Sequence, residues 1–130
     1  MHLKENVIFF NDLLAWIESN LTCKLTLDDV SKKAGYSKWY LQRAFRQYCG
    51  MGLGAYIRRR RLTLAAETLK TTSLSVKDIY ILYNWNCHQT FTRDFKKYFG
   101  QSPIEWRNTR ITDTSNMQPP FLDPSVRYSM

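Results

Sequence analysis

Two stretches of the sequence carry polar side chains at a spacing that suits hydrogen bonding to base edges in DNA. In the first stretch, these side chains recur at intervals of three and four residues and so share one face of a helix: Trp39, Gln42, Arg43 and Arg46. Arginine can donate two hydrogen bonds to guanine, glutamine can pair with adenine, and an aromatic edge can pack on a thymine methyl. We therefore expect this face to enter the major groove.

The second stretch repeats the arrangement. Its outward side chains have the same spacing, with two further polar residues at the helix entrance: Gln89, Thr92, Arg93 and Lys96, preceded by His88 and Thr90. Apolar residues occupy the opposite faces of both stretches: Leu41, Phe45 and Tyr48 in the first, and Phe91, Phe95 and either Tyr98 or Phe99 in the second. One such polar face could be a solvated helix surface, but its occurrence in both copies of a repeat favours base reading.

Residues 25–50 align with residues 74–100 when one extra residue is allowed in the second copy. The repeat therefore also includes the helices that precede these faces. Thr26 and Ser75 each stand three residues before an acid, which is the pattern of a helix N-cap. A hydroxyl at this position can accept from unpaired backbone amides, and the acid favours the positive end of the helix. Each copy is therefore predicted to begin with a short capped helix.

A turn follows each short helix. Gly35 and Asn84 occupy equivalent positions, and these two residue types readily adopt the positive φ of a sharp helix exit. An aromatic residue comes next and then a polar residue, Ser37 or Asn86, that could cap the following helix. A short helix, a tight turn and a longer helix with a glycine stop together predict a helix-turn-helix, present twice.

The rest of the chain is also predicted to be helical. Apolar spacing indicates an N-terminal helix that ends near Asn20 and a long helix between the repeats, and Pro103 suits the start of a last helix ending near Arg110. Strand signals are absent, so we predict an all-α fold of about seven helices. Its expected segments are a first helix-turn-helix subdomain (1–52), a linker helix (53–70), a second helix-turn-helix subdomain (71–110) and an irregular C-terminal tail (111–130).

The long linker helix suggests how one chain could read two grooves. A helix of ~17 residues is ~25 Å long. A rigid spacer of this length can hold two recognition helices about one DNA turn, ~34 Å, apart on one face of the duplex. A monomer would then suffice, and its site would be asymmetric because the two faces carry different side chains.

The charge balance favours a polyanionic partner. Lys and Arg number 19 against 11 Asp and Glu, for a net charge of +8, and every basic residue except Lys4 and Arg127 lies within residues 21–110. Nucleic acid is the first expectation and an anionic membrane surface the second. Charge alone also leaves a simple basic protein open. The sequence has no apolar run long enough to span a bilayer and no signal-peptide pattern, so we expect a cytoplasmic protein.

Further basic residues are predicted to contact DNA phosphates: Lys38, Arg46, Arg58, Arg60, Lys96, Lys97 and Arg107. Each could equally be ordinary solvated charge. Within the run from Arg58 to Arg61, a rotation of about 100° per residue puts the two end residues near the apolar arc and Arg59 and Arg60 outside it. The four arginines therefore cannot all reach phosphates.

Enzymatic chemistry finds no support in the sequence. The two histidines and the cysteines Cys23, Cys49 and Cys87 are scattered, and C-x-x-C is absent. We therefore predict no catalytic residue, no metal, no cofactor and no disulfide, with the cysteines serving as packing residues in a reducing cytosol. A membrane-surface or RNA-binding protein would need charge but not two matched polar helix faces.

Four segments closely resemble the AraC/XylS family, and within it the single-domain MarA/SoxS/Rob/RamA-like branch: Gly35–Arg43, Tyr56–Arg58, Gln89–Arg93 and Phe95–Phe99. The resemblance extends over residues ~7–110. It implies a monomeric bacterial activator of a degenerate, asymmetric site of about 20 base pairs that bends DNA. It also implies contact with RNA polymerase, control of stress and multidrug-resistance promoters, and a place on the nucleoid.

By position, the resemblance puts base contacts on two sets of residues: Trp39, Gln42 and Arg43 in the first unit, and His88, Gln89, Thr90, Thr92 and Arg93 in the second. The sequence departs from close relatives at His88, where they have glutamine, and at Asn84, which replaces the turn glycine. Larger family members carry an effector domain. The paired units fill nearly this whole sequence, so no small-molecule effector domain is expected. A repressor or an architectural DNA-binding protein remains an alternative to an activator.

Overall fold

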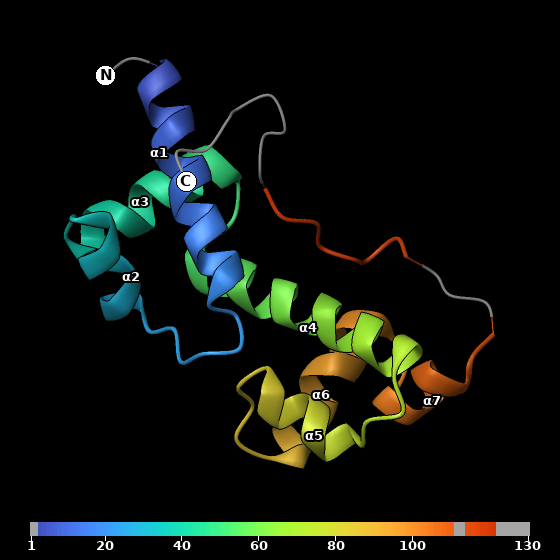
Figure 1. Ribbon diagram of the computed structural model, residues 1–130. Helices are drawn as coiled ribbons and strands as arrows, with labels where there is room; N and C mark the ends of the chain where they lie inside the picture. Colours follow the sequence, from blue (N-terminus) through green and yellow to red (C-terminus); the bar gives the residue numbers. More distant parts are fainter. Residues whose placement is uncertain (1–2, 111–113, 122–130) are drawn as a thin grey trace. The chain divides into compact units, whose positions relative to one another are not determined.

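The computed structural model describes residues 3–110 and 114–121, which form seven α-helices and no strands (Figure 1). The helices are α1 (Leu3–Ser19), α2 (Leu27–Ala34), α3 (Lys38–Cys49), α4 (Leu53–Thr71), α5 (Val76–Leu82), α6 (His88–Phe99) and α7 (Pro103–Asn108). The prediction of an all-α fold is confirmed. Within these described ranges, no helix has both the length and the apolar character needed to cross a bilayer.

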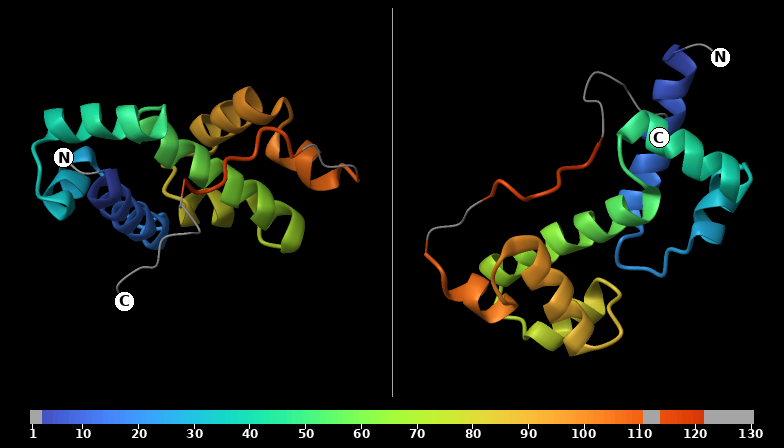
Figure 2. Two further views of the ribbon diagram at one scale, coloured as in Figure 1. Left: turned by 90° about the horizontal axis from the view of Figure 1, so that it is seen from above. Right: turned by 180° about the vertical axis from the view of Figure 1, so that it is seen from behind.

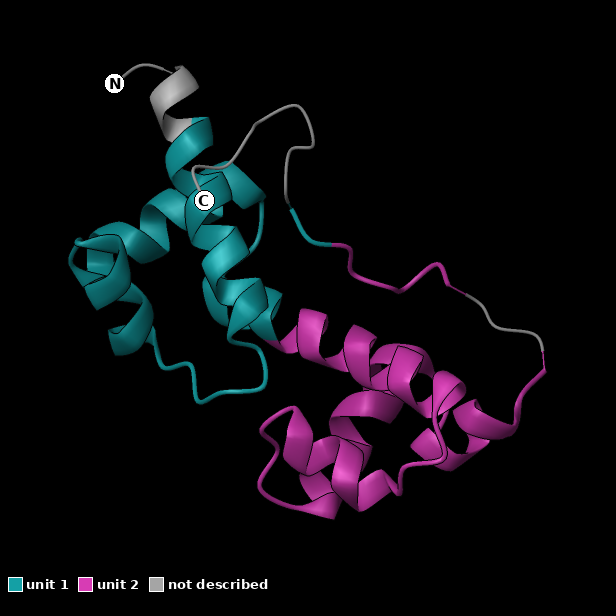
Figure 3. Cartoon of the chain, viewed as in Figure 1, with its two compact units in different colours: residues 1–57, 120–130 teal, residues 58–119 magenta. Residues whose placement is uncertain are grey.

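The chain divides into two compact units, each with one helix-turn-helix (Figure 3). Unit 1 holds the described residues up to Ile57 together with Pro120 and Phe121, and unit 2 holds Arg58–Pro119. These boundaries differ from the predicted segments. The long helix α4 is shared between the units instead of forming a separate linker, because its two ends belong to different cores. The C-terminal tail is likewise divided.

The core of unit 1 joins α1 to the helix-turn-helix formed by α2 and α3, and Figure 2 shows these helices from two further sides. Its buried apolar residues are Phe10, Leu13, Leu14, Ile17, Leu21, Val30, Leu41, Phe45, Leu53, Tyr56 and Ile57. The ring of Phe10 stacks on Tyr48, with centroids 4.4 Å apart, and meets Phe45 edge-on. Each fully buried large side chain contributes about 1.5–3 kcal/mol, so this core fixes the inner face of α3.

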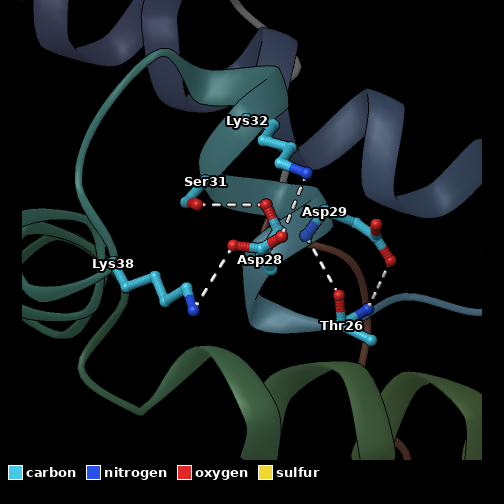
Figure 4. Close-up of polar contacts among 6 residues, drawn as sticks. All are labelled: Thr26, Asp28, Asp29, Ser31, Lys32 and Lys38. Atoms are coloured by element: carbon cyan, nitrogen blue, oxygen red, sulfur yellow. Dashed lines mark hydrogen bonds and ion pairs between the residues drawn. The ribbon is translucent and has the colours of Figure 1, made fainter.

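Helix α2 begins with the capping arrangement that the sequence predicts (Figure 4). The Thr26 hydroxyl accepts a hydrogen bond from the Asp29 N–H (3.0 Å), and the Asp29 carboxylate accepts one from the Thr26 N–H (3.0 Å). This second bond lowers the pKa of Asp29. The helix ends at Gly35 with φ of 78°, which leads the chain directly into the turn before α3.

Unit 2 repeats this construction around its own core. Ser75 caps α5 by accepting from the Asp78 N–H at 3.0 Å, and Asn84 takes the turn conformation with φ of 73°. The core residues are Leu62, Ala65, Ala66, Leu69, Ile79, Tyr80, Tyr83, Phe91, Phe95 and Trp106. Helix α7 closes this core, since the Trp106 indole N–H donates to the Ala66 carbonyl at 3.0 Å.

The start of α6 differs from the prediction, which placed the cap at Asn86. The N-cap is Cys87, because one more residue lies between Asn84 and α6 than between Gly35 and α3. The Cys87 Sγ lies 3.1 Å from the Thr90 hydroxyl. The first unit keeps the shorter spacing, and there Ser37 caps α3 by accepting from the Tyr40 N–H at 3.2 Å.

Substitution of Asn84 tests the turn of unit 2. A left-handed residue with a Cβ costs roughly 1–2 kcal/mol, and asparagine reduces this cost because its short polar side chain can hydrogen-bond locally. We therefore expect Asn84→Ala to lower the free energy of unfolding by about 1 kcal/mol. Asn84→Gly should equal or exceed the wild type. Urea unfolding measures both, with Asn86→Ala as an exposed neighbouring control. Equal stability of the alanine and glycine variants would mean that the positive φ does not matter.

The described part of the C-terminal tail is irregular but packed. In unit 2, the buried Gln118 donates from its N–H to the Thr63 hydroxyl at 2.8 Å, and its carbonyl accepts from the Arg60 guanidinium. In unit 1, the Phe121 ring stacks on Tyr56 with centroids 5.0 Å apart, and the Phe121 N–H donates to the Tyr56 hydroxyl. The tail therefore covers a side of α4 that the sequence left unassigned.

This contact corrects the orientation expected for the arginine run. Arg60 is only 5% exposed, whereas Arg58 is exposed. The helical-wheel argument used only the apolar residues of α4 and so assigned Arg60 to the solvent side. Arg60 lies under the tail, and we leave it out of the proposed phosphate contacts.

Candidate nucleic-acid interface

The outer face of α3 presents the residues predicted to read bases in unit 1. Leu41 and Phe45 are fully buried, while Trp39 is 66% exposed and Gln42, Arg43 and Arg46 are also exposed. The Arg43 guanidinium lies over the Trp39 ring, 5.4 Å from its centroid. Trp39 is therefore not a core residue of unit 1, and the cation–π contact helps to hold Arg43 on the outer face.

A groove beside this face joins α3 to the start of α4. It is lined by Trp39, Gln42, Arg43, Arg46, Gly52, Leu53, Gly54 and Ala55. The part contributed by α4 was not predicted from the sequence. A Cβ on Gly52 would come 3.2 Å from the Arg46 guanidinium, so the absence of a side chain at Gly52 leaves room for that group. The four residues of α3 that were predicted to face DNA thus all line this one groove.

The outer face of α6 presents the second set. His88, Gln89, Arg93 and Lys96 are exposed, and Thr90 and Thr92 are half-buried. The Thr90 hydroxyl is engaged with the Cys87 Sγ, and the Thr92 hydroxyl lies 3.5 Å from the His88 Nδ1. Phe91 and Phe95 are fully buried on the opposite side, as predicted.

Unit 2 has a groove of a different composition, between α4 and α6. It is lined by Arg58, Arg59, Leu62, Arg93, Asp94, Lys97 and Tyr98. The Arg59 guanidinium lies over the Tyr98 ring, 5.7 Å from its centroid. The Asp94 carboxylate accepts from the Trp85 indole N–H at 3.1 Å and lies 3.5 Å from the Arg93 Nε. Arg59 was expected on the outer side of α4, but neither it nor Trp85 or Asp94 was predicted as a site residue.

Five of the residues predicted to contact phosphates are exposed: Lys38, Arg46, Arg58, Lys96 and Lys97. The Lys38 ammonium pairs with Asp28 at 3.3 Å, and Lys32 pairs with the same carboxylate at 3.2 Å (Figure 4). Lys32 and Lys38 together lower the pKa of Asp28. Lys38 would have to exchange this partner for a phosphate.

Arg107, the remaining candidate, has a structural role. Its guanidinium donates to the carbonyls of Leu69 at 2.9 Å and Leu74 at 2.6 Å, and so ties the end of α4 to the loop before α5. Its charge also complements the negative end of the α4 dipole. Because its Nε and Nη2 donors hold these carbonyls, we assign Arg107 a structural role and do not include it, or Arg60, in the proposed phosphate set.

The part of the chain that the structure describes contains no group of three His, Cys, Asp or Glu side chains that could hold a metal ion. The three cysteines, all within the described residues, form no disulfide, and both Cys23 and Cys87 are exposed. The expectation that all three are packing residues is therefore wrong for these two. Cys49 is half-buried, and burial raises its pKa to about 12.

Alkylation should separate Cys87 from Cys49. The hydrogen bond from the Thr90 hydroxyl and the nearby backbone N–H groups lower the pKa of Cys87. Only the thiolate is nucleophilic. At pH 8 we expect iodoacetamide to label Cys87 several-fold faster than Cys49, as read by peptide mass spectrometry. Comparable rates would contradict the role of the α6 N-terminus in stabilising this thiolate.

The two capped helix-turn-helix units, each with a polar outer helix face and basic flanks, define a DNA-binding protein. A family model described as a helix-turn-helix domain matches residues 30–109. The transcriptional activator AarP of Providencia stuartii is 44% identical over 125 residues, which cover 96% of this chain and 90% of AarP. The probable transcription factor PqrA of Proteus vulgaris is 42% identical over 115 residues, or 86% and 93% of the two chains.

The transcriptional regulator Rob of Salmonella typhimurium is 46% identical over 110 residues, which cover 85% of this chain but only 38% of Rob. Among solved structures, the C-terminal domain of the response regulator AraT from Geobacillus stearothermophilus superposes with a TM-score of 0.75 at 27% identity, covering 82% of this chain and 89% of that one. This chain belongs to the AraC/XylS family, in its MarA/Rob-like branch. It is a DNA-binding transcription regulator.

Trp39 offers a test of the unit 1 face. Because the Trp39 ring is largely exposed, Trp39→Ala should lower affinity for the specific DNA site by about tenfold, within the range of a base contact. The melting temperature should change by less than about 2 °C. Fluorescence anisotropy and circular dichroism measure these quantities. A variant that unfolds would instead make Trp39 part of the core.

Proposed function

We propose that this protein is a transcription activator that binds, as a monomer, an asymmetric and degenerate DNA site of about 20 base pairs. Helix α3 would enter one major groove and α6 the next. The base-reading residues would be Trp39, Gln42 and Arg43 in unit 1, and His88, Gln89, Thr90, Thr92 and Arg93 in unit 2. Lys38, Arg46, Arg58, Lys96 and Lys97 would contact phosphates.

One observation carries this proposal: a single chain presents two equivalent helix faces with different side chains. Arg43 lies beside an exposed Trp39 in unit 1, whereas Arg93 lies beside an acid in unit 2. Two identical faces would favour a palindromic site, as in dimeric helix-turn-helix proteins. Two different faces on one chain favour a monomer and an asymmetric site.

Activation is proposed by recruitment of RNA polymerase to stress and multidrug-resistance promoters in the bacterial cytoplasm, on the nucleoid. AarP, which is similar to this chain over nearly its full length, is named as a transcriptional activator, and this supports the proposal. The exposed arginine and lysine side chains of both units would supply the sequence-independent part of DNA affinity.

A second candidate is an architectural DNA-binding role. A relative in Escherichia coli, 46% identical over 110 residues, is called right origin-binding protein, a name that describes binding to an origin rather than to a promoter. The matched region covers 38% of that relative. This role needs the same two reading faces but no polymerase contact.

Transcription with purified components would distinguish these roles. A duplex carrying the preferred site upstream of a promoter is transcribed by RNA polymerase with and without the protein, and run-off products are quantified. The proposal expects several-fold more transcript, which disappears when either half of the site is mutated. Less transcript would indicate a repressor, and an unchanged yield on an occupied site would indicate an architectural protein.

A further inference from the structure

The unit 2 groove contains an acidic side chain among cations. Arg58, Arg59, Arg93 and Lys97 line it together with Asp94. A surface that approaches the DNA backbone would bind any sequence most tightly if it were wholly cationic. A carboxylate there would lower sequence-independent affinity.

Asp94 is held in place by a hydrogen bond from outside the groove. The Trp85 indole N–H, in the turn before α6, donates to Asp94 Oδ2 at 3.1 Å, and the carboxylate side chain is only 22% exposed. An aspartate on a solvated helix surface would sample several rotamers. This one is fixed by the turn of its own helix-turn-helix.

The other carboxylate oxygen, Oδ1, lies 3.5 Å from the Nε of Arg93. Consecutive residues of a helix do not normally face each other, so the Arg93 side chain bends back toward Asp94 to make this contact. Arg93 is otherwise 73% exposed. To bind guanine O6 and N7, its guanidinium would have to exchange the carboxylate for a base edge that offers two acceptors.

We infer that Asp94 is a specificity-determining residue that positions Arg93 and opposes sequence-independent binding of DNA phosphates in the groove of unit 2. A phosphate brought near Arg93 meets the carboxylate as well. A correctly placed guanine offers Arg93 two hydrogen bonds that compensate for the lost ion pair. Asp94 thus weakens binding to other sequences more than it weakens binding to the preferred site. This inference rests on the proposed base-reading role of α6.

The test compares affinities for the selected site and for a random duplex at several salt concentrations. Asp94→Asn removes the charge but keeps an oxygen that can accept from Trp85. Glu67→Gln is the matched control, since it removes one negative charge from an exposed position on α4 outside the groove. Asp94→Ala removes both the charge and the Trp85 partner.

We expect Asp94→Asn to raise affinity for random DNA about three- to tenfold and to steepen its salt dependence by up to about one unit of slope. The ratio of specific to random affinity should fall by a similar factor. Glu67→Gln should change the ratio less than about twofold. Asp94→Ala should reproduce the loss of ratio, with circular dichroism confirming that each variant is folded.

Two results would overturn the inference. The first is that Asp94→Asn and Glu67→Gln change the ratio of specific to random affinity equally. The second is that only Asp94→Ala lowers this ratio, which would mean that Asp94 acts only as the hydrogen-bond partner of Trp85. Failure of the proposed function looks different, because the wild-type protein would then bind the selected and random duplexes equally.

Discussion

Replacing Arg93 by alanine is expected to weaken binding to the specific site by about 1–3 kcal/mol, roughly five- to 150-fold. Arg93 is exposed on α6, at the position equivalent to Arg43 of α3. Its guanidinium can make two hydrogen bonds to one guanine, and alanine can make neither. Affinity for random DNA should fall much less, because that binding depends on total charge rather than on a base contact.

Lys97→Ala is the matched comparison for Arg93→Ala. Lys97 lies one helical turn further along α6 and lines the same groove. Because Lys97 is proposed to contact a phosphate, Lys97→Ala should lower affinity for the specific site and for random DNA by similar factors. It should also make the salt dependence of binding shallower by about one unit of slope. Titrations of both variants on both duplexes measure this. Equal losses on the two duplexes for Arg93→Ala would remove its role in base reading.

Deletion of residues 117–130 is expected to lower the free energy of unfolding by about 2–4 kcal/mol. The deletion removes the acceptor of the buried Arg60 guanidinium and the donor to the Thr63 hydroxyl. It also removes the ring that stacks on Tyr56. Arg60 and Thr63 are rehydrated once the covering segment is gone, so the expected loss is that of two hydrogen bonds, one of them from a charged donor, and of the aromatic contact. Urea unfolding followed by circular dichroism measures the loss.

Gln118→Ala controls for this deletion, because the contacts with Arg60 and Thr63 use the backbone of Gln118 rather than its side chain. The Gln118 side-chain amide donates to the neighbouring Pro119 carbonyl. The substitution should therefore cost less than about 1 kcal/mol. If the truncated protein were as stable as the wild type, the tail would not be part of the fold.

Sequence reasoning predicted the helix-turn-helix units well because their signals are local. The Thr26 cap depends on an acid three residues away, and the turn at Asn84 depends on one backbone conformation. The inner faces of α3 and α6 followed from helical spacing alone. The cap of α6 was misplaced because a single additional residue moved it from Asn86 to Cys87.

The arginines were harder to predict because their environments depend on distant segments. Arg60 is buried by residue 118, and Arg107 is occupied by carbonyls more than thirty residues earlier in the chain. A helical wheel shows only the residues of one helix, so it includes neither of these partners. The groove of unit 2 was missed for the same reason, since Asp94 gains its role from Trp85 in the preceding turn and from arginines of α4.

Selection of preferred sites from random duplexes, with wild-type protein and with the variants Arg43→Ala and Arg93→Ala, tests the central claim most directly. We predict one protein per duplex and two different blocks of base preference about one helical turn, ~10 base pairs, apart. Each variant should lose one block and keep the other. A palindromic site occupied by two proteins, or loss of the same block in both variants, would contradict the assignment of one reading face to each unit.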